Sequence, residues 1–100
     1  LVREVEDLEH RARRQDVLTL DAYAWALHRN QRHAEADKVM ARALAVGTRE
    51  PKLLYHAGTI ALAVGDRPRA ERLLQDALAV APRAAFAAKA RATLARAGKP

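Results

Sequence analysis

The chain has 100 residues, enough for one domain, and half of them are apolar although only 4% are aromatic. It contains 24 alanines, and a fold built on such small side chains must bring its backbones close together, which favours packed helices over a β-sandwich. The absence of cysteine excludes disulfide scaffolds and thiol catalysis, and it fits a reducing compartment such as the cytoplasm.

The formal net charge is +6, and all of the excess lies in the second half of the chain. Residues 1–50 carry nine acidic and nine basic side chains, whereas residues 51–100 carry three acidic and nine basic ones. Such asymmetry indicates either an anionic partner or simply a solvated basic face. No apolar stretch approaches the ~20 residues of a membrane span. Because the chain begins at Leu1 rather than Met, we expect it to be a piece of a longer protein.

Three helices are predicted in the first half. Apolar residues at helical spacing predict an amphipathic helix over residues 2–14. A second helix is expected over residues 20–30, with Thr19 as its N-cap. A third is expected over residues 33–46, ending at Gly47 in the left-handed conformation that glycine favours after a helix.

The second half predicts three more helices. Pro51 suits the first turn of a helix that ends at Gly65. Asp66 caps the next helix, over about residues 67–80, and Pro82 closes it. A last helix is expected over about residues 83–97. The connections are too short for anything but antiparallel neighbours, and no segment alternates like a strand.

A repeat runs through these helices. The tetrapeptide Ala-Leu-Ala-Val occurs at 43–46, 61–64 and 77–80, each time at the end of a predicted helix. We call the displacement from Ala43 to Ala77 the repeat shift, and it carries the first copy of the tetrapeptide onto the third. The repeat shift also superposes further apolar or small pairs: Leu20 on Leu54, Ala24 on Gly58, Ala36 on Ala70 and Met40 on Leu74.

Two short antiparallel helices that recur every ~34 residues, as the repeat shift does, are typical of the tetratricopeptide repeat. Residues 54–82 resemble this repeat closely, with small residues, a turn glycine and a closing proline where its pattern expects them, namely Gly58, Gly65, Ala70, Ala77 and Pro82. The preceding copy is looser, because Gln31 replaces the turn glycine and Thr48 replaces the closing proline. The arginine- and alanine-rich composition suggests a bacterial-type member.

The resemblance implies an all-α fold of about six helices, stacked as a short right-handed α-solenoid in one domain over residues 1–100. Residues 1–16 would form a divergent or capping helix, 17–50 the first repeat, 51–84 the second, and 85–98 a partial repeat or capping helix. Small residues where two helices of a hairpin cross let them approach closely. A single repeat cannot bury its apolar face alone, so stability would come from stacking.

The resemblance also implies a function. In such solenoids the first helix of each hairpin lines a concave groove, which would bind a protein partner as an extended peptide or a helix, with an acidic end as one candidate feature. The residues at these positions are Asp21, Trp25, His28, Arg29, Tyr55, Thr59, Leu62, Lys89, Thr93 and Arg96. Rigid aromatics beside cationic groups have the composition of a binding hot spot. Whether Trp25 lies in the groove or in the core stays open.

Enzyme classes find no support in the sequence. The chain has no serine for a nucleophile elbow, no glycine-rich phosphate loop and no pair of histidines spaced as in a zinc protease. The four histidines form no convincing metal-binding face with a carboxylate. We therefore expect a non-catalytic scaffold module without cofactor or metal.

Two other classes of partner remain. The basic second half could bind a nucleic acid or another anionic surface through Arg67, Arg69, Arg72, Arg83, Lys89, Arg91 and Arg96. Single-strand binders interleave such charges with aromatic stacking platforms, and here only Phe86 lies among them, so this reading ranks second. A homodimer through the exposed ends of the repeat array is the third.

Overall fold

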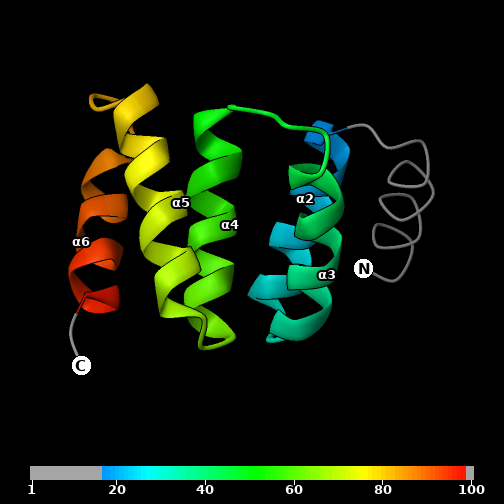
Figure 1. The fold of residues 1–100 in the computed structure, drawn as a ribbon. Coiled ribbons are helices and arrows are strands. Elements are labelled where there is room, and N and C mark those ends of the chain that lie inside the picture. Colours follow the sequence, from blue (N-terminus) through cyan, green and yellow to red (C-terminus); the bar gives the residue numbers. More distant parts are fainter. Residues whose placement is uncertain (1–16, 99–100) are drawn as a thin grey trace. The chain divides into compact units, whose positions relative to one another are not determined.

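The computed structural model describes residues 17–98, and all regular structure in that range is helical (Figure 1). The all-α prediction is therefore confirmed for this part of the chain. The first predicted helix, over residues 2–14, lies outside the described residues. The elements in chain order are α2 (Val17–Arg29), α3 (His33–Leu44), α4 (Pro51–Ala63), α5 (Arg67–Val80) and α6 (Ala87–Ala97).

The chain divides into two compact units, with the division between Thr48 and Arg49. In the first unit, α2 and α3 form an antiparallel hairpin (Figure 1). Ala24 of α2 and Ala36 of α3 are fully buried, as expected for small residues that let two helices pack closely. Larger side chains complete this core, namely Leu20, Leu27, Val39 and Met40.

In the second unit, α4 and α5 form another antiparallel hairpin, and α6 packs mainly on α5 (Figure 1). Gly58 of α4 is buried against Leu74 of α5, and a Cβ atom built on Gly58 would lie 2.7 Å from the Leu74 Cγ atom. Where the three helices meet, the buried residues are Ala61, Ala70 and Ala97. Small side chains at this junction let the three helices lie close together.

Several helix ends follow the chemistry of their residues. Pro51 opens α4, and the Glu50 carboxylate accepts a hydrogen bond from the Lys52 backbone N–H at 3.4 Å. The Asp66 carboxylate caps α5 as predicted, accepting from the Arg69 backbone N–H at 3.3 Å. Proline lacks the N–H that the first turn would leave unpaired anyway, so its place in α4 costs nothing.

Two predicted helix starts are wrong. Val17 and Leu18 are already part of α2, so Thr19 lies inside the helix and is not the N-cap. Threonine costs little inside a helix, so it does not force a helix to begin there. α6 begins at Ala87 rather than near residue 83, because the preceding segment forms turns, in which the Ala87 N–H donates to the Ala84 carbonyl at 2.9 Å.

The backbone follows the same repeat as the sequence. The repeat shift carries the end of α2 onto the end of α4, and it carries the start of α3 onto the start of α5. The turns between the helices close with equivalent hydrogen bonds. Arg32 N–H donates to the Leu27 carbonyl at 2.9 Å, and Asp66 N–H donates to the Ala61 carbonyl at 2.9 Å. Hydrogen bonds of this span are characteristic of a Schellman helix end.

The residue at the centre of each turn takes a left-handed conformation. Gly65 has φ +87°, and Gln31, its counterpart under the repeat shift, has φ +66°. Glycine adopts this conformation without penalty, whereas glutamine carries a Cβ atom that disfavours it. The first repeat therefore keeps the turn geometry of the second although it lacks the glycine.

Candidate functional site

The first-unit candidates centre on Trp25 of α2. Its ring stacks on the ring of His28, one turn later, with centroids 4.9 Å apart and an interplanar angle of 28°. Both side chains are half-buried, and Arg29 beside them is exposed. Trp25 is thus partly exposed, and the His28 ring covers one of its faces.

A second contact extends this group across the turn. The His28 Nδ1 and His33 Nδ1 atoms lie 2.8 Å apart, so one donates a proton to the other. The His33 Nε2 atom lies 3.3 Å from Gln31 Oε1. Sequence reasoning missed His33 and Gln31, because the spacing between His28 and His33 crosses a turn and matches no helical face.

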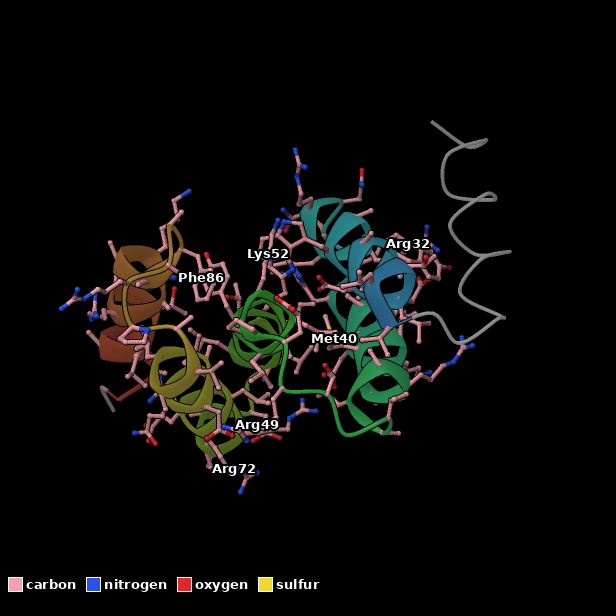
Figure 2. The ribbon with its side chains drawn as sticks, turned by 90° about the horizontal axis from the view of Figure 1, so that it is seen from above. Arg32, Met40, Arg49, Lys52, Arg72 and Phe86 are labelled. Carbon is pink, nitrogen blue, oxygen red and sulfur yellow. The ribbon has the colours of Figure 1, made fainter. Side chains whose placement is uncertain are left out.

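The second-unit candidates centre on Tyr55 of α4. Its ring stacks on Phe86, just before α6, with centroids 5.1 Å apart and planes only 10° from parallel. Figure 2 shows Phe86 between the start of α6 and α4. Phe86 was not among the predicted site residues, because its place in a turn followed no helical period. The stack covers one face of Tyr55, which is half-buried.

Thr59 and Thr93 make the same internal hydrogen bond in two helices. The Thr59 hydroxyl donates to the Tyr55 carbonyl at 3.0 Å, and the Thr93 hydroxyl donates to the Lys89 carbonyl at 2.9 Å. The repeat shift carries the first pair onto the second, so α6 continues the register of α4. Because each hydroxyl already donates its proton to a carbonyl of its own helix, it can only accept a hydrogen bond from a ligand.

The ten predicted groove residues differ in exposure. Arg29, Lys89 and Arg96 are exposed, whereas Asp21 and Thr93 are only 8% and 5% exposed. Asp21 and Thr93 therefore offer little surface to a partner. The remaining five are half-buried: Trp25, His28, Tyr55, Thr59 and Leu62. The structure groups them by unit, with Tyr55, Thr59 and Leu62 on α4 and Lys89, Thr93 and Arg96 on α6.

Some of the basic side chains have partners within the chain. The Arg69 Nε atom lies 3.1 Å from an Asp66 carboxylate oxygen, and Arg91 Nη2 donates to the Pro82 carbonyl at 2.7 Å. In the first unit, the hydrogen bond to Glu35, at 2.6 Å, raises the pKa of Arg32 above its ordinary value. These local pairings reduce the positive charge that Arg69 and Arg32 present to an anionic partner.

Among residues 17–98, no three histidine, aspartate or glutamate side chains gather into a group that could hold a metal ion. No helix in the same range is both long and apolar enough to cross a membrane. The chain matches no protein-family model, and neither a curated protein nor a solved structure is significantly similar to it. The functional argument therefore depends on the chain's own geometry.

Proposed function

We propose that the chain is a tetratricopeptide-type interaction module whose hairpins stack as a short right-handed α-solenoid. The observation that supports this proposal is the repeat in the backbone. The repeat shift carries the end of α2 onto the end of α4 and the start of α3 onto the start of α5, and the turns between them close with equivalent hydrogen bonds. Such modules present the first helix of each hairpin to a partner, which assigns the binding face to α2, α4 and α6.

The ligand on this face would be an extended peptide or a helix. In the second unit, the parallel stack of Tyr55 and Phe86 makes a rigid apolar platform. Rigid aromatic groups bind with little loss of conformational entropy, and hot spots are enriched in them. The exposed ammonium group of Lys89, on the adjoining helix, would pair with an acidic side chain or a terminal carboxylate.

In the first unit, Trp25 and His28 supply a second aromatic surface, with Arg29 exposed beside it. A peptide with apolar side chains and a nearby carboxylate would suit either set of residues. The chain would position its partner without chemistry of its own, as a scaffold part of a larger protein.

Binding of a nucleic acid or another anionic surface is the second candidate. The excess of basic residues in the second half supports it. The stack of Phe86 on Tyr55 weighs against it. Tyr55 covers one face of the single phenylalanine, so that face is not available for stacking with a base. Arg69 and Arg91 are also held by partners within the chain.

Selection of peptides from a random display library tests the proposal. The variant Lys89→Ala/Arg96→Ala removes two exposed charges from α6, on the proposed binding face. The control Arg67→Ala/Arg72→Ala removes two exposed charges from the second helix α5 (Figure 2 labels Arg72 on α5). We expect enriched peptides to bind the control like the wild type and the α6 variant at least tenfold more weakly.

The second candidate predicts a different pattern. Phosphate contacts weaken by orders of magnitude between about 50 and 200 mM salt, and both charge-removing variants would then lose affinity alike. An equal loss in the two variants, or a library that yields no binding peptide, would contradict the peptide-binding proposal.

A further inference from the structure

The histidine pair at the α2–α3 turn has a geometry that the proposed peptide-binding function does not use. Its two Nδ1 atoms lie 2.8 Å apart, with ring centroids 4.7 Å apart and planes tilted by 56°. Both rings are half-buried, so solvent ions reach them. Each neutral imidazole has one nitrogen with a lone pair, and a change of tautomer in one ring would leave both Nδ1 atoms with lone pairs at the same place.

The distance between the two Nδ1 atoms can be compared with the ligand spacing of different metal geometries. Metal–imidazole bonds are about 2.0 Å long, so two nitrogens at adjacent corners of a square lie about 2.8 Å apart. At two corners of a tetrahedron they would lie about 3.3 Å apart. A hydrogen bond holds the His28 and His33 Nδ1 atoms 2.8 Å apart in the free protein, and this is also the separation of adjacent ligands at 90° around one ion, so the rings need little movement to bind it. Imidazole ligands in this geometry are typical of Cu²⁺ and Ni²⁺.

Gln31 supplies a second and independent contact. Its Oε1 atom lies 3.3 Å from His33 Nε2, where it accepts that nitrogen's proton and leaves His33 Nδ1 with its lone pair. Metal-bound histidines usually donate their other N–H to an oxygen in this way. Gln31 also holds a left-handed backbone, where the second repeat has Gly65. A residue other than glycine at a disfavoured conformation is consistent with a use for its side chain.

We propose that His28 and His33 form a binding site for one Cu²⁺ or Ni²⁺ ion, with both Nδ1 atoms as ligands and water in the remaining positions. In the free protein one of the two Nδ1 atoms carries a proton. On binding, that histidine carries the proton on Nε2 instead, so neutral imidazoles bind the ion without net proton release. The second repeat has Leu62 and Arg67 at the equivalent positions, so the site belongs to the first repeat alone.

Fluorescence of the single tryptophan tests the site directly. Trp25 stacks on His28, and a paramagnetic Cu²⁺ ion held by that ring would quench its emission. We expect titration of the whole chain with Cu²⁺ to give a single saturable quenching step with one ion per chain. His28→Gln/His33→Gln should weaken binding at least tenfold, and the control His10→Gln should titrate like the wild type.

Three further measurements separate the site from loose surface binding. Gln31→Gly keeps the turn and removes only the side-chain contact, and it should weaken Cu²⁺ binding about tenfold. Acidification from about pH 7.5 to about pH 5.0 should also weaken binding, because protonated imidazole is no ligand. The electron paramagnetic resonance spectrum of the Cu²⁺ complex should show two imidazole nitrogens. A spectrum with one or none, or a double variant that binds like the wild type, would overturn the proposal.

Discussion

The tightest contact between helices lies at Gly58. A Cβ atom there would stand 2.7 Å from Leu74 Cγ and 3.3 Å from the Ala70 carbonyl oxygen. Leu74 is fully buried, so its side chain has no open space to move into. We expect Gly58→Ala to lower the free energy of unfolding by about 1–3 kcal/mol through overpacking, despite alanine's higher helix propensity. Urea denaturation followed by circular dichroism measures this loss.

Gly98→Ala is the matched control, because the nearest atom to its built Cβ is 3.6 Å away, an ordinary contact. It should unfold within about 0.5 kcal/mol of the wild type. Equal or greater stability of Gly58→Ala would mean that α4 and α5 do not cross at this residue.

Single residues also show where the sequence is informative. The repeat shift identified Gly58 as the close approach between helices from the sequence alone. No such pattern marks Phe86 or His33. Phe86 lies in the turn segment before α6, and the α2–α3 turn separates His33 from its partner, so neither lies at a helical spacing from the ring that it contacts. A stack such as that of Phe86 on Tyr55 depends on the path of the intervening turn, which local sequence determines only weakly.

The α2–α3 and α4–α5 turns form a natural pair for comparison. Both hold a left-handed residue, Gln31 in one and Gly65 in the other. We expect Gly65→Ala to cost about 1–2 kcal/mol, because alanine resists this conformation. Gln31→Gly should cost nothing, since relief of the same strain offsets the greater freedom of glycine in the unfolded chain. Thermal unfolding of the two variants measures the difference, and equal destabilisation would contradict the equivalence of the turns.

Helix ends were predictable where a side chain has specific cap chemistry. Asp66 and Pro51 mark helix starts that the structure confirms. Gly47 has the expected left-handed φ of +83°, but the predicted helix end at residue 46 is wrong, because α3 ends at Leu44. The starts of α2 and α6 were not predictable to the residue. Helix propensities near Thr19 and Arg83 differ by only a few tenths of a kcal/mol, so packing decides where each helix begins.

At the scale of the whole molecule, the sequence predicted the helical class and the repeat. Both depend on the periodic spacing of apolar residues, which can be read from the sequence directly. The repeat period also predicted which residues lie on the first helices, but it did not predict how exposed those residues are. Asp21 is buried although its spacing placed it on the binding face, since burial depends on what packs against a helix rather than on spacing alone.

Chemical-shift mapping by nuclear magnetic resonance tests the central claim most directly. A peptide from the display selection would be titrated into the ¹⁵N-labelled chain. The account predicts that amide shifts change along the first helices, at Trp25, Arg29, Tyr55 and Lys89, while the second helices α3 and α5 stay unchanged. Changes confined to α3 and α5, or to the basic residues Arg67, Arg72 and Arg83, would contradict it.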